Sequence, residues 1–193
     1  MTAVTTGQQG RQPGRRTTGL SARRPRVAVV VGNPSPGSRT RATAEQVAAD
    51  LAGEPAGVVV DLADWGPSLL DHRDAAADQM VEEVCASDLV VVASPTYKAS
   101  YTGLLKLFLD RVPPGGLRGV VAVPLMLGGH PGHALAPELC LRPVLVELGA
   151  AVPAPALYVL DRQHDDPAAW ADWLDRARPL VTLLTLHTTG APA

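Results

Sequence analysis

Short apolar segments recur along the chain and are separated by stretches with helical spacing. Each of five segments is a continuous run rich in Val, Ala and Leu, bounded by Gly, Pro, Ser or Asp. Continuous apolar runs of this length, closed by turn residues, are typical of β-strands that are buried on both faces. The predicted strands are residues 27–31, 58–62, 89–93, 120–127 and 156–160.

Helical spacing fills the intervals between these strands. Apolar residues there recur three and four positions apart, as on the buried face of a helix. The predicted helices are residues 41–52, 75–87, 102–111, 134–148, and a last helix capped by Asp165 or Asp166. Residues 65–73 show no such period, and we predict an irregular loop there.

Two prolines fall inside predicted elements. Pro124 lies in the fourth strand, which predicts a bulge or a position near the edge of the sheet, because proline has no N–H to donate. Pro143 lies inside the helix at 134–148, so that helix must kink or the hydrogen-bond ladder must already be disturbed at that point.

The alternation of strand and helix predicts the fold class. Five strands that alternate with helices require right-handed crossovers and a parallel sheet covered on both faces, which is an α/β fold. Ligands of such sheets bind at the carboxyl ends of the strands, where the strand order reverses. The loops after the first, third and fourth predicted strands are all rich in Gly, Pro and hydroxyl residues. We therefore predict a binding site at this edge.

The first of these loops has the composition of an anion site. It offers Ser35, Ser38 and Thr40 as hydroxyl donors and Arg39 as a positive charge. A helix that begins near Thr40 also directs its free N–H groups and the positive end of its dipole into the loop, which suits a phosphate. The alternative is an ordinary strand–helix turn in which a serine caps the helix.

Charge and cysteine content exclude several classes. The net charge is -2, yet residues 1–26 contain six arginines and no acid, so the remainder is acidic and does not resemble a nucleic-acid-binding body. We predict a disordered basic tail over residues 1–24, either a solvated extension or an arm for nucleic acid or another partner. A domain at 25–187 and a flexible C-terminus at 188–193 complete the predicted organisation. Cys85 and Cys140 lack the spacing of a zinc or disulfide framework, which favours a cytoplasmic location.

The second loop carries the most specific motif. It reads Pro-x-Tyr-Lys-x-x-x-x-Gly-x-Leu-Lys over residues 95–106. Together with the other loops it resembles the NADPH-dependent FMN reductases of the flavodoxin-like superfamily, and within them the branch that serves sulfonate utilisation. The residues that carry the resemblance, besides 95–106, are Gly32-Asn33-Pro34, Ser38-Arg39-Thr40, Gly128-Gly129 and Arg142-Pro143-Val144-Leu145.

The resemblance implies a flavodoxin-like three-layer sandwich with strand order 2-1-3-4-5, and it implies the flavin site. Ser38, Arg39 and Thr40, with Ser35 in the same loop, would bind the flavin phosphate. The isoalloxazine ring would lie against the second loop, and the glycine loop would approach its other edge. The residues implied there are Pro95, Thr96, Tyr97, Lys98, Gly128, Gly129 and His130. Tyr97 and Tyr101 have an alternative role as rim aromatics that pack on a neighbouring subunit.

By the same resemblance the chain is an NAD(P)H-dependent FMN reductase that uses NADPH or NADH and supplies reduced FMN to a flavin-dependent monooxygenase. It would form a homodimer or homotetramer. The charge distribution and the lack of a long apolar run predict no nucleic-acid or membrane partner. Two alternatives stay open: a flavoprotein that retains FMN and reduces a quinone, azo or other acceptor, and a non-enzymatic electron carrier. No catalytic acid or nucleophile is expected, because the cofactors carry the hydride chemistry.

Two details qualify these expectations. The sulfonate branch has an aromatic or polar residue, linked to a π-helical bulge at a tetramer interface, where this chain has Leu139; this departure weakens the expectation that FMN is exchanged as a substrate. His130 and His133 are spaced for one face of a helical turn, but no third ligand lies near them. We expect polar loop residues there and no metal site.

Overall fold

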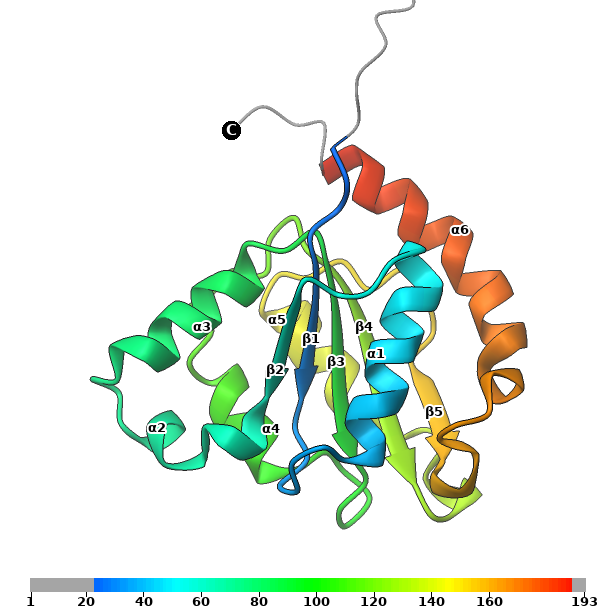
Figure 1. The fold of residues 1–193 in the computed structure, drawn as a ribbon, viewed down its shortest axis with the longest axis horizontal. Coiled ribbons are helices and arrows are strands. Elements are labelled where there is room, and N and C mark those ends of the chain that lie inside the picture. Colours follow the sequence, from blue (N-terminus) through cyan, green and yellow to red (C-terminus); the bar gives the residue numbers. More distant parts are fainter. Residues whose placement is uncertain (1–22, 189–193) are drawn as a thin grey trace, which may run out of the picture.

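The computed structural model, which describes residues 23–188, contains a single five-stranded parallel sheet (Figure 1). Its strand order is β2-β1-β3-β4-β5, so the predicted α/β class and strand order are confirmed. Every predicted strand is present within a few residues of its expected bounds. The strands are β1 (Val27–Val31), β2 (Val58–Asp61), β3 (Leu89–Pro95), β4 (Val121–Gly128) and β5 (Leu157–Leu160).

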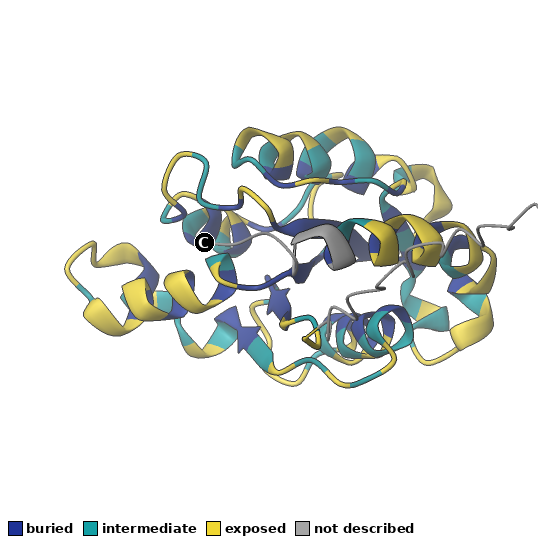
Figure 2. Cartoon of the chain, turned by 90° about the horizontal axis from the view of Figure 1, so that it is seen from above, coloured by how far each residue is buried: buried dark blue, intermediate teal, exposed yellow. Residues whose placement is uncertain are grey.

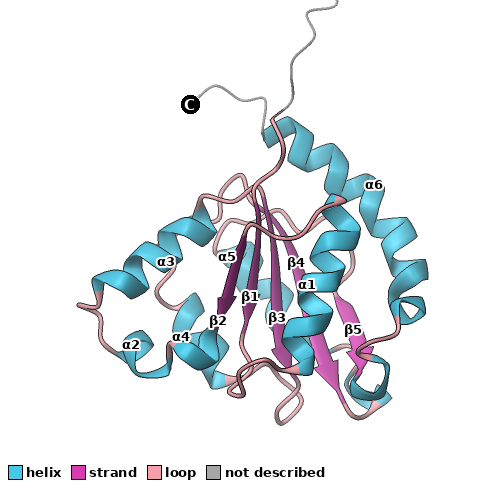
Figure 3. Ribbon diagram, viewed as in Figure 1, coloured by secondary structure: helices cyan, strands magenta, loops and turns pink. Residues whose placement is uncertain are grey.

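Helices cover both faces of this sheet and form the outer layers of a three-layer sandwich (Figure 3). The α-helices are α1 (Arg39–Ala52), α2 (Gly66–Leu70), α3 (Ala75–Cys85), α4 (Gly103–Leu109), α5 (Arg142–Glu147) and α6 (Ala171–Thr188). The shorter helical segments are η1 (Leu62–Asp64), η2 (Pro131–His133), η3 (Pro137–Leu141), η4 (Asp161–Gln163) and η5 (Pro167–Trp170).

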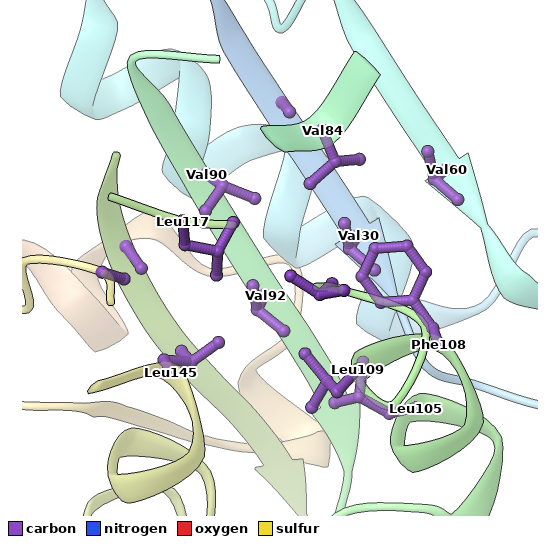
Figure 4. Close-up of a cluster of buried hydrophobic side chains, with 14 of the residues drawn as sticks. Val30, Val60, Val84, Val90, Val92, Leu105, Phe108, Leu109, Leu117 and Leu145 are labelled. Carbon is purple, nitrogen blue, oxygen red and sulfur yellow. The ribbon is translucent and has the colours of Figure 1, made fainter. Parts of the chain in front are cut away.

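The strands are apolar throughout because each face of the sheet meets a separate layer of helices. Side chains alternate between the two faces along a strand. Val30, Val90 and Val92 point toward α2, α3, α4 and α5, where they pack with Phe108 and Leu145 (Figure 4). The continuous apolar runs of the sequence therefore mark strands with two buried faces.

The opposite face of the sheet is covered by α1 and α6. Val29 and Val91 belong to this second core, together with Val47 of α1 and Trp173 of α6. Seen from above, the buried strands lie between helices whose outer surfaces are exposed (Figure 2). Two packed cores thus hold the sheet from both sides.

The predicted irregular loop at residues 65–73 is wrong for residues 66–70, which are helical, and holds for residues 71–73. The chain forms the 3₁₀ turn η1 directly after β2 and then the short helix α2. Pro67 lies at the start of α2, where the missing N–H costs nothing because the first amides of a helix have no partner within the helix. Leu69 anchors the helix in the core, with 1% of its surface exposed.

Pro124 sits in β4, which is flanked by β3 and β5 and is therefore no edge strand. Hydrogen bonds of β4 alternate: Val121 donates to Asp88 on the β3 side, and Ala122 donates to Ala151 on the other side. By this alternation the missing N–H of Pro124 faces the β5 side. The pairing of β4 with β5 begins only at Leu125, so Pro124 interrupts no pair of that ladder. The strand tolerates proline at a gap in its pairing.

Pro143 lies where the helical ladder is disturbed, as predicted. The segment Pro137–Leu141 is a π-helix, and the amide of Arg142 donates to the carbonyl of Pro137, five residues earlier. Proline inside a helix removes one amide donor and crowds the carbonyl four residues before it, and a wider turn relieves both problems. Leu139 occupies this wide turn, so the π-helix forms with a leucine at that position.

The described chain begins at a tight ion pair. The guanidinium of Arg23 donates to both oxygens of the Asp88 carboxylate, at 2.8 and 2.7 Å, and the amide of Arg26 donates to the same group at 2.6 Å. Most of the predicted tail and of the predicted flexible C-terminus lies outside the described residues. Within residues 23–188, no helix is both long and apolar enough to cross a membrane.

Candidate functional site

The loops after β1, β3, β4 and β5 meet at one edge of the sheet, where the strand arrows point in Figure 1. The loop after β1 is ordered by Asn33. Its side-chain oxygen accepts the amide of Ser35 at 2.9 Å, and its amide nitrogen donates to the Thr40 hydroxyl at 3.1 Å. Asn33 therefore spans this loop from its start to the first turn of α1.

The start of α1 presents donors toward this loop. Ser38 caps the helix by accepting the amide of Arg41 at 3.2 Å. The alternative prediction, a strand–helix turn in which a serine caps the helix, is therefore also confirmed. In the described part of the chain, the amides of Arg39 and Thr40 have no acceptor, as expected for the first residues of a helix. With the dipole of a 14-residue helix behind them, these amides favour an anion.

Arg39 adds a positive charge at the same place. Its side chain is exposed, and among the described side chains no carboxylate pairs with it. Arg41, two residues later, is already engaged: Nε lies 2.6 Å from Glu45, and Nη1 lies 3.5 Å from Asp61. The hydrogen bond to Glu45 raises the pKa of Arg41 further above its usual value, with Asp61 adding to the effect. Of these two arginines, Arg39 is the one available to a ligand.

The loop after β3 forms a strained two-residue turn. Tyr97 and Ser100 pair with each other through both backbone hydrogen bonds, at 2.8 and 3.1 Å. The residues between them, Lys98 and Ala99, have φ angles of 52° and 61°. Residues other than glycine rarely adopt these left-handed backbone angles. Backbone strain of this kind clusters at ligand sites. The turn holds Tyr97 with 53% of its surface exposed.

The glycine loop after β4 packs against β5 and the loop after β3. A side chain at Gly128 would place its Cβ 2.3 Å from the Tyr158 hydroxyl and 2.9 Å from the Thr96 hydroxyl, so only glycine fits. Tyr158 donates to the carbonyl of His130 at 2.8 Å, and the amide of Thr96 donates to Leu127 at 2.6 Å. Burial raises the pKa of Tyr158, which stays a neutral donor near pH 7.

A cavity of about 300 Å³ lies between these loops. Six predicted site residues line it, and so the structure brings together the loops after β1 and β3. Two further lining residues, Asn33 and Asp161, were not predicted. The predicted lining residues are Ser35, Ser38, Arg39, Thr40, Pro95 and Tyr97.

Asp161 follows the last residue of β5, and this position in the sequence could have identified it as a candidate site residue. The rule that puts ligands at the carboxyl ends of parallel strands applies to β5 as it does to β1, β3 and β4. The loop that contains Asp161 is tied to α1, because the Thr43 hydroxyl donates to the carbonyl of His164 at 2.9 Å. Asp161 is a short acceptor beside the anion site, suited to hydroxyl groups of a ligand.

The other five predicted residues do not line this cavity. Thr96 and Gly128 are directed into the packing between the loops, and Lys98, Gly129 and His130 are exposed beside it. Tyr101 packs against the core of its own chain. His130 and His133 stack edge to face with ring centres 6.2 Å apart, and among the described residues no group of three or more metal-ligating side chains occurs.

A larger cavity, about 420 Å³, lies at the opposite edge, where β1 and β2 begin. Its rim carries the ion pair of Arg24 and Glu54, with the two groups 2.9 Å apart, and a second carboxylate from Glu83. None of the helices within residues 23–188 has its first residues among those that line this cavity. The smaller cavity is therefore the better candidate, because it combines an anion site with an aromatic wall at the carboxyl edge of the sheet.

Arg142, from the motif Arg142-Pro143-Val144-Leu145, does not line this cavity and stabilises the fold instead. Its guanidinium donates to the carbonyls of Ala154 and Val152, each at 3.0 Å, and Nε lies 3.3 Å from Glu138. Glu138 in turn accepts the amide of Ala156 at 2.8 Å. These contacts hold the segment before β5 against the π-helix.

Comparisons with known proteins match the chain to one family. The family described as NADPH-dependent FMN reductase matches residues 25–165. The chain is 36% identical over 129 residues to an FMN reductase (NADPH) of Escherichia coli K12, covering 65% of this chain and 68% of the relative. It is 32% identical over 169 residues to the NADH-dependent FMN reductase SfnF of Pseudomonas putida, covering 81% and 91%.

Solved structures show the same relationship. The apo form of the NADH:FMN oxidoreductase EMOB superimposes with a TM-score of 0.73 at 34% identity, covering 86% of this chain and 91% of that one. A flavodoxin from the domain Archaea, 18% identical with a TM-score of 0.50, shares the fold alone, over 84% of this chain and 98% of that one.

Proposed function

Because the chain belongs to the NADPH-dependent FMN reductase family, we propose that FMN binds across the loops after β1, β3 and β4, with its phosphate at the start of α1. The chain is an NAD(P)H:FMN oxidoreductase, and FMN and NAD(P)H are the molecules on which it acts. The two cofactors supply the hydride chemistry between them. The protein binds and orients them and excludes water.

The observation that carries this proposal is the composition of the cavity beside α1. The amides of Arg39 and Thr40, the Ser38 and Thr40 hydroxyls and the Arg39 guanidinium form a donor set that fits a phosphate dianion. Asn33 and Asp161 offer acceptors for ribityl hydroxyls. Pro95 and Tyr97 form the wall on which a flat ring can stack.

The cavity lies at the lower end of the range for small-molecule sites, roughly 300–1,000 Å³. It suits the phosphate and ribityl chain, and the ring then extends over the turn at Tyr97 and Lys98 toward the loop of Gly128, Gly129 and His130. Tyr97 is exposed there, so a second subunit completes the ring site in this proposal. The chain therefore acts as a homodimer or homotetramer.

Exposed apolar side chains support self-association through the segment that contains the π-helix. Leu135, Leu139 and Val146 expose 65%, 66% and 52% of their surfaces. In this proposal Leu139→Glu dissociates the oligomer, as seen by sedimentation velocity. Leu70→Glu on α2 is the control, because Leu70 is equally exposed (66%) but lies on a different helix. An unchanged mass for Leu139→Glu contradicts an interface at this segment.

Reduced FMN leaves the protein and supplies a flavin-dependent monooxygenase in the cytoplasm. In the resembling branch the π-helix has an aromatic or polar residue where this chain has Leu139. The π-helix forms here despite the leucine, which supports exchange of FMN as a substrate. The resemblance to the sulfonate-utilisation branch supports the monooxygenase as the recipient. Both cysteines are free, which agrees with a reducing compartment.

The test mixes the purified full chain with FMN and NADPH or NADH without oxygen and follows the loss of flavin absorbance. The reduced flavin is then passed through a filter that retains protein. Fast bleaching with reduced FMN in the filtrate supports the proposal. Protein that stays yellow after desalting and retains its flavin on the filter supports the alternative of a bound-FMN enzyme that reduces a quinone, azo or other acceptor. Bleaching no faster than without protein contradicts both.

A further inference from the structure

The hydroxyl of Thr102 lies between two of the loops that form the site. It donates to the carbonyl of Gly32 at 2.5 Å and accepts the amide of Leu105 at 3.1 Å. Thr102 is therefore the N-cap of α4 and also a link to the loop after β1. Only 3% of its surface is exposed, so water cannot replace either bond.

The backbone of Thr102 is linked to the loop after β3. Its amide donates to the Ser94 hydroxyl at 3.0 Å, and that hydroxyl donates to the carbonyl of Pro95 at 2.8 Å. Ser94 is fully buried. The loop after β1, residues 32–38, is called the phosphate loop, and the loop after β3, residues 96–102, is called the ring loop. The carbonyl of Gly32 lies at the start of the phosphate loop, and the carbonyl of Pro95 lies at the start of the ring loop. Thr102 thus contacts the first of these points directly and the second through the Ser94 hydroxyl.

Packing fixes the same spacing. A Cβ on Gly32 would lie 2.5 Å from the Cβ of Leu105, so the first turn of α4 presses directly on the backbone at the start of the phosphate loop. The amide of Gly32 also donates to Ala93 of β3 at 2.7 Å. The amide and the carbonyl of Gly32 belong to successive peptide groups, so the bond from Thr102 fixes the second of these groups and with it the direction in which the loop leaves the sheet.

We infer that Thr102 is a positioning residue that sets the distance between the phosphate loop and the ring loop, and that it thereby favours FMN over flavins without a phosphate. This inference rests on the proposed binding of FMN across both loops. A ligand held at two points is sensitive to the distance between them. Riboflavin lacks the phosphate and is held by the ring loop alone, so a change in spacing leaves its affinity nearly unchanged.

The test compares FMN and riboflavin affinities in Thr102→Val and Thr102→Ser by quenching of flavin fluorescence. Valine has nearly the shape of threonine but no hydroxyl, and serine keeps the hydroxyl. Valine removes both bonds of the hydroxyl, but only the bond to Gly32 holds the loop after β1. Loss of that one buried hydrogen bond corresponds to about a tenfold change in an equilibrium constant. We expect Thr102→Val to weaken FMN binding about tenfold and riboflavin binding less than about twofold. Thr102→Ser retains wild-type values for both flavins within about twofold.

The control is Thr185→Val on α6, which removes another buried hydroxyl bond, from Thr185 to the carbonyl of Val181 at 2.9 Å. It leaves the ratio of the two affinities unchanged. Equal weakening of both flavins by Thr102→Val overturns the inference, since a purely structural role has that effect. Unchanged FMN affinity overturns it as well.

Ser94→Ala tests the other side of the link if Thr102→Val does not fold. It removes the acceptor of the Thr102 amide and leaves the Thr102 hydroxyl in place. We expect a selective loss of FMN affinity of about threefold, and an equal loss for both flavins overturns the inference. The wild-type chain separates this inference from its premise: if it binds FMN no better than riboflavin, the proposed phosphate site itself is wrong.

Discussion

The carboxylate of Asp61 accepts the amide of Gly37 from the loop after β1, with Oδ2 and N 3.2 Å apart. The same oxygen lies 3.5 Å from Nη1 of Arg41, and Oδ1 accepts the amide of Ala63 at 3.3 Å. Asp61 is the last residue of β2 and exposes 4% of its surface. A buried carboxylate at the end of one strand therefore holds the loop that follows its neighbour.

Asp61→Asn is expected to weaken FMN binding about tenfold. Both carboxylate oxygens accept hydrogen bonds, so an asparagine must turn its NH₂ group toward a donor on one side. An unsatisfied buried group costs about 1–3 kcal/mol, and the phosphate loop loosens. Titration of FMN measures the effect. Asp64→Asn is the control, because Asp64 is exposed one turn further along. Equal affinities for Asp61→Asn and the wild type contradict this role.

Arg39→Ala is expected to raise the KM for FMN roughly tenfold and to leave that for riboflavin unchanged. Charge-assisted hydrogen bonds contribute about 1.5–3 kcal/mol, and the exposure of Arg39 reduces this value. Added salt weakens FMN binding to the wild type more than to the variant, because it screens the guanidinium. Arg176→Ala, an exposed arginine of α6, serves as the control. A parallel rise of both KM values rules out a phosphate contact.

Ala99→Gly is expected to stabilise the fold by about 0.5–1 kcal/mol. Ala99 has a φ of 61°, where a side chain costs energy and glycine does not. Ala134→Gly provides the opposite case: its φ of -58° suits alanine, and glycine there destabilises the chain by a similar amount through its greater freedom when unfolded. Urea unfolding of both variants measures the difference. If both variants are destabilised alike, the turn at Ala99 is not strained.

The fold followed from the sequence because its signals were local. The run at residues 27–31 is buried at every position. Its unbroken series of apolar residues therefore correctly indicated a strand that is covered on both faces of the sheet. Pro143 predicted a disturbed helix because proline has no N–H to donate, and no distant contact changes that. The helix α2 escaped notice because Gly66 and Pro67 are typical of a loop, whereas the anchor of Leu69 in the core exists only after the chain has folded.

The lining of the candidate cavity was predictable in part, since six of the eleven predicted residues line it, and its contacts were less predictable. The anion loop followed from helix capping and from the positions of Ser38 and Arg39. That Thr96 is turned inward, and that Tyr158 closes on Gly128, depend on how two loops far apart in the sequence pack together. Asp161 was missed although it follows a strand at the same edge, because its loop contains neither glycine nor serine to mark it.

Gly128→Ala is expected to destabilise the chain by about 1–3 kcal/mol and to weaken FMN binding, because the new Cβ would lie 2.3 Å from the Tyr158 hydroxyl. That hydroxyl donates to the carbonyl of His130, so its displacement also frees the loop toward which the flavin ring extends in our proposal. Gly129→Ala is the matched control, since no atom lies within 4 Å of a Cβ at that position. Thermal unfolding and FMN titration measure the two effects.

A second substitution identifies the cause. Tyr158→Phe removes the atom nearest to the new Cβ and leaves the ring in place, so the double variant Gly128→Ala with Tyr158→Phe recovers part of the lost stability. Recovery is incomplete, because the Thr96 hydroxyl still lies 2.9 Å from that Cβ. Neighbouring residues of this kind couple by about 0.5–3 kcal/mol in a double-mutant cycle. If the two changes add independently, the clash at Gly128 does not involve Tyr158, and another contact holds the glycine loop against β5.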